Sequence, residues 1–206
     1  MTGLYVPFWL ADCNLDADVH ALGKQISTWT SGSYRYTRTK EYDVYRHAKI
    51  DFDGIPADGA SKINDGLMEA IEPFDYTKLE PFSMSYLSGF FADKYDVDKA
   101  GVFQRIRNRA VSGSEQIVRG SMTGYDSVTP TASNYNILET QWQYILLPVW
   151  FMTFNFKQKQ YSFAINGQSG KLAGIPPLSA ARVAAFASAL FAVVTGLFGI
   201  AGLFVR

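Results

Sequence analysis

Residues 127–156 read SVTPTASNYNILETQWQYILLPVWFMTFNF and contain a single charged residue, Glu139. Threonine, valine, isoleucine and the aromatic residues, which are frequent here, favour extended strands. The near absence of charge is typical of strands that are covered on both faces of a sheet. We therefore expect this stretch to lie deep in a β-sheet.

Two turns follow this stretch and predict that the sheet continues. The run Lys157–Gln160 separates two apolar segments, Tyr144–Phe156 and Tyr161–Ile165, as expected for a hairpin. Asn166-Gly167 and Ser169-Gly170 then form a second tight-turn signal before Lys171–Ala173.

The N-terminal part of the chain predicts further strands. Leu4–Leu10 is apolar, and Pro7 places it at an edge or a bulge because proline cannot donate to a ladder. Residues 12–30 are compatible with a helix, from the spacing of their apolar residues, or with a continued irregular strand. Tyr34–Val44 alternates as a half-buried strand does, and Ile50–Ile55 extends the same sheet.

The central part of the chain changes to a helical period. A first helix begins at Asp58 or Ser61 and ends before Pro73, and a second begins at Pro81 with Met84, Leu87 and Phe91 as its buried stripe. Asp98 caps a third helix, which buries Val102, Ile106 and Ala110. The order of elements predicts an α+β fold, with a mostly antiparallel sheet built from N- and C-terminal strands around a central helical segment.

The C-terminal segment from Val183 to Val205 reads VAAFASALFAVVTGLFGIAGLFV and carries no charge. As a helix it would be about 34 Å long, against roughly 30 Å of bilayer hydrocarbon. A buried core helix is the alternative, but core helices usually keep a polar stripe. We therefore predict a cytosolic α+β domain over 1–175, a linker over 176–182 and a single transmembrane helix over 183–205. Because no N-terminal signal is visible, the expected location is the cell membrane, with the N-terminal domain in the cytosol.

The familiar catalytic patterns do not fit the sequence. Gln168–Lys171 lacks the first glycine and the hydroxyl residue of a phosphate-binding loop, and Asp96–Gly101 places Arg107 where a calcium loop needs glutamate. The lone Cys13, with His20 or His47, is the one candidate for a nucleophile pair. No serine-hydrolase elbow of the type G-x-S-x-G is present. We predict no catalytic, cofactor-binding or metal-binding residues.

Two stretches gather positive charge, although the whole chain is neutral. Residues 99–120 hold five cations against Glu115, and Arg105 and Arg109 share one helical face. Arg35 and Arg38 lie among tyrosines on the strand that begins at Tyr34. These four arginines are the candidate contacts for an anion or a nucleic acid. A solvated helix face and tyrosines packed in a sheet are the simpler alternatives.

Several segments together resemble a known family. They are YVPFWL at 5–10, PADGASKINDGLMEAIEPFDY at 56–76, YLSGFFADKYDVD at 86–98 and the hairpin region at 144–174, followed by a hydrophobic tail. The chain resembles bacterial TFIIB-type zinc-ribbon-containing proteins, some of which are labelled primosomal, PriA-like DNA helicases. The resemblance implies zinc ribbons upstream and a membrane segment at the C-terminus. Because this chain lacks the CxxC pairs, zinc is expected only in those upstream ribbons and no cofactor is expected here.

These observations predict a non-enzymatic, membrane-anchored cytosolic module that binds a partner or serves as a scaffold. The expected partners are the lipid bilayer and a protein, and the oligomeric state is left open. The alternative is a nucleic-acid-associated accessory protein that uses the basic segment 99–120. An enzyme whose cleft is built from scattered aspartate and tyrosine residues is the third hypothesis.

Overall fold

A computed structural model describes residues 1–177 and 179–204. The long strands are β1 (Thr2–Ser31), β2 (Tyr34–Asp58) and β4 (Ser127–Phe156), and the short ones are β3 (Phe91–Ala92), β5 (Lys159–Asn166) and β6 (Leu172–Gly174). The helices are α1 (Asp65–Ile71), α2 (Lys99–Ser121) and α3 (Ala180–Phe204). Two 3-10 turns, Tyr76–Lys78 and Met84–Leu87, complete the described elements.

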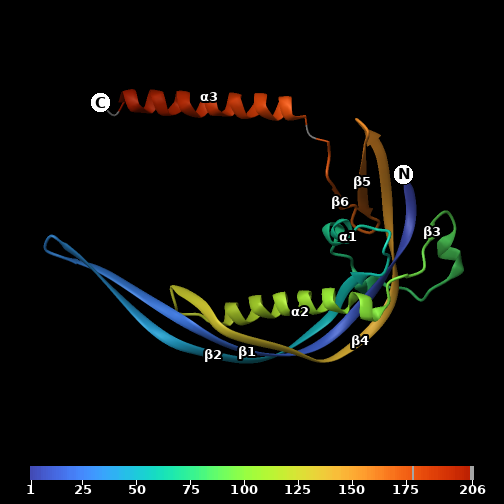
Figure 1. Cartoon of the computed structure of the whole chain (residues 1–206), viewed down its shortest axis with the longest axis horizontal. Coiled ribbons are helices and arrows are strands. Elements are labelled where there is room, and N and C mark those ends of the chain that lie inside the picture. Colours follow the sequence, from blue (N-terminus) through green and yellow to red (C-terminus); the bar gives the residue numbers. More distant parts are fainter. Residues whose placement is uncertain (178, 205–206) are drawn as a thin grey trace.

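One sheet organises the molecule, in the strand order β2-β1-β4-β5-β6. All of its neighbouring pairs are antiparallel, apart from the short parallel contact between β3 and β1. Bulges interrupt the pairing at Ala11/Cys13, Asn14/Leu15 and His20/Ala21. Such bulges bend a sheet, and Figure 1 shows β2, β1 and β4 as a long curved ribbon with α2 along its inner side.

Strand β1 contributes to two hydrophobic cores. Alternate residues from Trp9 to Ala21 pack in a core with Val102, Ile106 and Ala110 of α2. The residues of the other parity, Val6, Phe8 and Leu10, belong to a second core with Met68 and Ile71 of α1. Because neighbouring side chains of a strand point to opposite faces, the two helices lie on opposite sides of the sheet.

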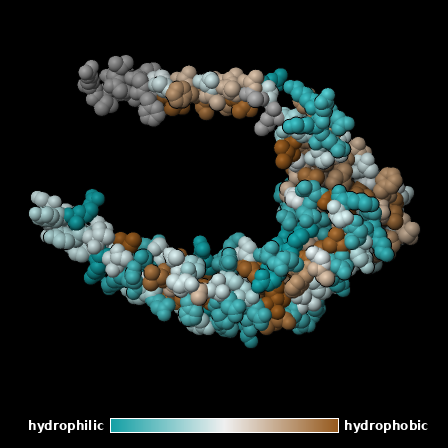
Figure 2. Space-filling view, in the orientation of Figure 1, coloured by the Kyte–Doolittle hydropathy of each residue, from teal (hydrophilic) through white to brown (hydrophobic). Residues whose placement is uncertain are grey.

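The fold confirms the predicted antiparallel sheet and the helix capped by Asp98, whose side chain accepts a hydrogen bond from the Gly101 N–H. Residues 12–30 form a strand and not a helix, because the odd-numbered residues from Cys13 to Ala21 are buried in the core that contains α2 and the pairing with β2 continues to residue 31. The helix predicted to begin at Pro81 is wrong. Met84 and Phe91 are 72% and 69% exposed, so no face of this segment is available to stabilise a helix by packing. Figure 2 shows hydrophobic surface in this part of the molecule, near β3.

The first predicted helix is shorter than expected. It begins after Asn64, whose side chain accepts a hydrogen bond from the Leu67 N–H, and not after Asp58 or Ser61. Asp58 is the last residue of β2 and is only 2% exposed. The helix ends at Ile71, two residues before Pro73, as predicted.

The transmembrane prediction is wrong. Within the part of the chain that the structure describes, no helix has both the length and the apolar character needed to cross a membrane. The predicted single-pass location in the cell membrane is therefore wrong as well, whereas the predicted bilayer and protein partners stay predictions. Val183 lies in α3, which begins at Ala180, inside the predicted linker 176–182. Val205, the predicted far end of the span, lies outside the described residues.

Candidate functional site

Arg105 and Arg109, the two predicted anion contacts on α2, meet carboxylates of the same chain. The Arg105 guanidinium lies 2.7 Å from Asp58, 3.2 Å from Asp65 and 3.4 Å from Glu69. The Arg109 guanidinium lies 3.0 Å from Glu72 and donates to the Pro56 carbonyl at 2.8 Å. These contacts join α2 to α1 and to the end of β2. The predicted contact with an external anion stays a prediction, and it would have to compete with these carboxylates.

The carboxylates of this cluster are partly desolvated. Burial raises the pKa of Asp58, and hydrogen bonding and charge from Arg105 oppose that shift. Burial likewise raises the pKa of Glu72, opposed by Arg109. Asp58 Oδ1 accepts from Arg105, but Asp58 Oδ2 is buried without a hydrogen-bond partner. Arg105 therefore compensates a carboxylate that would otherwise be costly to bury.

Arg35 and Arg38 lie far from this cluster, on the outer part of the β1–β2 hairpin. We call residues 26–43 the arm, because every residue in this range is exposed. The arm extends beyond the end of α2 as a two-stranded ribbon (Figure 1). In the pairing register, Trp29 lies opposite Tyr36 and Ser31 opposite Tyr34.

The two faces of the arm differ in character. Trp29, Tyr34, Tyr36 and Arg38 share one face with Lys40, whereas the opposite face holds Arg35 and four threonines. The Trp29 and Tyr36 rings stack with centroids 5.7 Å apart and an interplanar angle of 16°. From residue 26 to 40 the arm carries three cations and no carboxylate. The tertiary structure thus collects the aromatic residues and two of the three cations on one face, which we call the aromatic face.

The candidate nucleophile pair does not form. Cys13 is buried in the core beside α2, its Sγ lies 3.9 Å from Thr140 Oγ1, and burial raises the pKa of its thiol. His20 and His47 lie on the other face of the sheet, because they follow the opposite parity. There, the Tyr45 hydroxyl donates a hydrogen bond to Asp18, the His47 ring also hydrogen bonds to it, and both hold the pKa of the Asp18 carboxyl below its ordinary value. Among the described residues, no group of three or more His, Cys, Asp and Glu side chains is placed to hold a metal ion.

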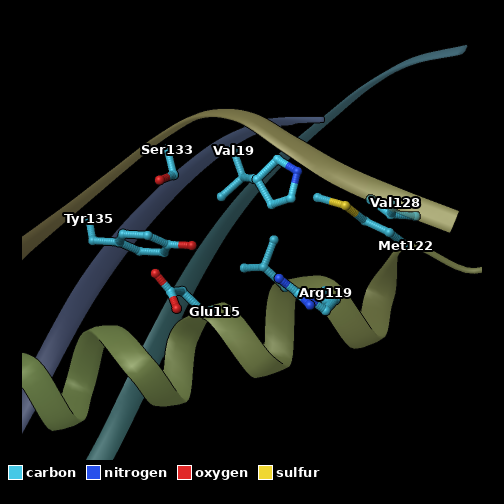
Figure 3. Close-up of a pocket in the computed structure, with 9 residues that line it drawn as sticks. Val19, Glu115, Arg119, Met122, Val128, Ser133 and Tyr135 are labelled. Carbon is cyan, nitrogen blue, oxygen red and sulfur yellow. The ribbon is translucent and has the colours of Figure 1, made fainter. Parts of the chain in front are cut away.

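Two hollows mark the described surface. A cavity of about 100 Å³ lies between the C-terminal half of α2 and strands β1 and β4, with Glu115, Arg119, Ser133 and Tyr135 around it (Figure 3). Pockets for organic ligands typically measure 300–1,000 Å³, so this cavity is small for such a ligand. An open hollow of about 460 Å³ lies where the β4–β5 hairpin meets the start of α3, lined by Lys157, Lys159 and Arg182 among others.

Two important residues were not recognised in the sequence. The sequence pattern predicts a helix start at Asp58, and its partner Arg105 lies in a distant helix, so no local spacing signals the pair. Asn166 belongs to a predicted turn, yet its side chain is fully buried and donates hydrogen bonds to the carbonyls of Ile71 and Pro73. Only the Asn-Gly signal pointed to Asn166, and that signal indicates the turn but not the burial.

Comparison with known proteins finds one relative of similar sequence. The chain is 33% identical over 190 residues to a protein of Bacillus subtilis (strain 168) described as uncharacterized protein YdjG. No family model and no solved structure matches the chain, so the zinc-ribbon label receives no support from these comparisons. The alignment covers 92% of this chain and 56% of the Bacillus protein, so the chain is similar to little more than half of that relative's length.

Proposed function

We propose that this chain is a non-enzymatic binding module and that the aromatic face of its arm contacts an acidic surface of a protein partner. The observation that carries the proposal is the arm itself, which is exposed throughout and gathers Trp29, Tyr34, Tyr36 and Arg38 on one face. Tryptophan, tyrosine and arginine are the residues that dominate binding energy at protein interfaces.

The isolated position of the arm supports a role in binding. A two-stranded hairpin is only marginally stable in water, because neither of its faces is covered. The arm keeps its register through the stacked Trp29–Tyr36 pair, and the Lys24–Glu41 ion pair of 2.8 Å lies at its base. A partner that covers the aromatic face would complete the packing that the chain itself does not supply.

The charges favour a protein partner over a nucleic acid. Residues 1–171 hold 17 basic and 19 acidic residues, so the body next to the arm does not attract a polyanion. The two best-placed cations of the basic segment, Arg105 and Arg109, already face carboxylates. The aromatic face itself carries two cations, Arg38 and Lys40, that complement a local acidic surface, and its stacked rings offer a preformed aromatic contact.

Site-specific photo-cross-linking in cells tests the proposal. A photoreactive phenylalanine analogue at Tyr34, on the aromatic face, is expected to capture a discrete protein, whereas the same analogue at exposed Gln104 on α2 is not. Arg38→Glu should reduce the captured product roughly tenfold, because it reverses a charge at the contact. Arg35→Glu makes the same change on the opposite face of the arm and should leave the product unchanged.

Three outcomes would contradict this function. Equal loss of the product in the Arg35→Glu and Arg38→Glu variants would mean that the aromatic face is not the contact. A product that nuclease removes, together with binding of an oligothymidine probe by the purified chain, would favour the nucleic-acid alternative. The absence of any product at Tyr34 above the Gln104 control would remove the arm as a binding element.

A further inference from the structure

The face of the sheet that lies away from α2 is acidic along the middle of β1. The odd-numbered residues of β1 from 13 to 21 are buried with α2, so the even-numbered residues from 12 to 18 point to the other face. In the pairing register, one residue of β2 and one residue of β4 lie opposite Asn14 and share this face. The five carboxylates that gather there, which we call the acidic face, are those of Asp12, Asp16, Asp18, Asp51 and Glu139.

The acidic face is open and only partly neutralised. Three of its five residues are exposed and two are partly buried, and α1 covers this side of the sheet only at residues 6–10 of β1. Lys49 lies opposite Asp16, and the His47 ring lies 2.9 Å from the Asp18 carboxylate. Carboxylates two residues apart on one strand are separated by about 7 Å, so they repel each other. A cationic surface placed against this face would offset that repulsion.

We propose that the acidic face of a second copy of this chain is the surface to which the arm binds, an inference that rests on the proposed function and names its partner. The arm supplies the complementary charge, because its aromatic face carries Arg38 and Lys40 and no carboxylate occurs from residue 26 to 40. The aromatic face follows the parity of the side that packs on α2, so it and the acidic face lie on opposite sides of the sheet. Trp29 also lies about 36 Å along β1 from Asp18. An arm can therefore meet an acidic face only on another copy.

This contact joins two different surfaces, so the copies associate head to tail. The aromatic face lies on the inner side of the curved ribbon, which α2 follows, and the acidic face lies on its outer side, so the two surfaces are complementary in curvature (Figure 1). Each added copy presents a free arm and a free acidic face, so association continues beyond two copies unless the rotation between copies closes a ring. Because opposite charges hold the contact, raising the salt concentration should weaken it: the Debye length falls from about 10 Å at 0.1 M to about 3 Å at 1 M.

The photoreactive analogue at Tyr34 identifies the partner. We expect a product of twice the mass of the chain, in which mass spectrometry finds the arm joined to a peptide from the acidic face, such as the one that contains residues 12–18. A product that joins the arm to a different protein would overturn this inference and leave the binding function of the arm intact. The absence of any product above the Gln104 control would overturn both.

Charge reversal on each surface tests the pairing with the purified full chain. The arm variant Arg38→Glu/Lys40→Glu and the face variant Asp51→Lys/Glu139→Lys each place like charges on both sides of the contact. In sedimentation equilibrium, either variant alone should associate at least roughly tenfold more weakly than the parent. An equimolar mixture of the two variants should recover the association, because it restores opposite charges wherever an arm of one variant meets the acidic face of the other.

The matched control is Glu80→Lys/Asp93→Lys, which reverses two exposed carboxylates outside the acidic face and should associate as the parent does. Circular dichroism establishes that all variants are folded. A parent that stays monomeric over a hundredfold range of concentration, or whose association does not weaken with salt, would overturn the proposal. So would arm and face variants that associate as tightly as the control, or a mixture of them that recovers nothing.

Discussion

Replacing Arg105 with methionine is expected to lower the free energy of unfolding by about 3–5 kcal/mol, because the change leaves the buried Asp58 carboxylate without its cation. Asp58 is 2% exposed and its Oδ1 lies 2.7 Å from the Arg105 guanidinium. Methionine keeps most of the volume of the side chain, so the loss measures the charge and not a cavity. Urea denaturation followed by circular dichroism gives the change. Arg107→Met, at an exposed position of the same helix, is the matched control and should change stability by less than about 0.5 kcal/mol.

The same variant should respond to pH in a defined direction. Burial already raises the pKa of Asp58 above its ordinary value, and removing Arg105 removes the main opposing influence. A carboxyl whose pKa is higher in the folded state than in the unfolded state favours folding most when it is protonated. The stability difference between Arg105→Met and the parent should therefore shrink as the pH falls from neutral into the range where Asp58 takes up a proton.

A second substitution distinguishes this electrostatic explanation from simple loss of packing. In the double variant Asp58→Asn/Arg105→Met, no buried carboxylate is left, so most of the lost stability should return. A double variant as unstable as Arg105→Met alone would contradict the explanation. So would a deficit in Arg105→Met that does not change with pH.

Replacing Asn166 with alanine should cost at least about 3 kcal/mol, since each buried polar group left without a partner costs about 1–3 kcal/mol. The Asn166 amide donates to the carbonyls of Ile71 and Pro73 at 3.0 and 3.1 Å. Its carbonyl oxygen accepts from the Gln168 and Ser169 N–H groups at 2.8 and 3.0 Å. The hydrogen bonds of this one buried side chain thus connect the end of β5 to the end of α1 and the segment that follows it.

Aspartate at this position tests the role of the donor. Asn166→Asp keeps the acceptor for Gln168 and Ser169 but turns a carboxylate oxygen toward two carbonyl oxygens, so at neutral pH it should destabilise at least as much as alanine. Protonation restores one donor, so this variant should recover part of its stability in acid. Asn134→Ala removes an exposed asparagine of β4 and is the control. If Asn166→Ala and Asn134→Ala changed the urea midpoint equally, the assigned hydrogen bonds would not matter to stability.

Several elements could be predicted because their signals are local. Asp98 and the spacing of Val102, Ile106 and Ala110 predict α2, since a cap and a period of 3.6 residues act within a few turns. The apolar composition of Leu4–Leu10 predicts a strand, and the structure shows why it is apolar on both parities: it serves the cores of both helices. The predicted helix after Pro81 failed because its apolar residues have nothing to pack against.

The candidate sites could be predicted only in part. Arg105 and Arg109 were placed correctly on one helical face, but their carboxylate partners on α1 and at the end of β2 depend on how distant segments meet. The tyrosines and arginines of the arm were visible, yet the division between an aromatic face and a threonine face follows from the register of β1 on β2. The low charge of β4 predicts a position deep in the sheet, and the structure places β4 between β1 and β5, although β5 pairs with it only from Val149 to Phe156.

By itself, the sequence determined the local features of this protein: the extended strands, the capped helix α2, the turns and the near absence of charge in β4. Each depends on the conformational preferences of residues that are close together in the chain. The tertiary structure alone decided that β1 lies between β2 and β4, that Asp58 meets Arg105, and that the highly charged β2 forms one edge of the sheet. These features depend on contacts between segments far apart in the chain, whose formation is governed by packing and burial, and no local pattern specifies which segments come together.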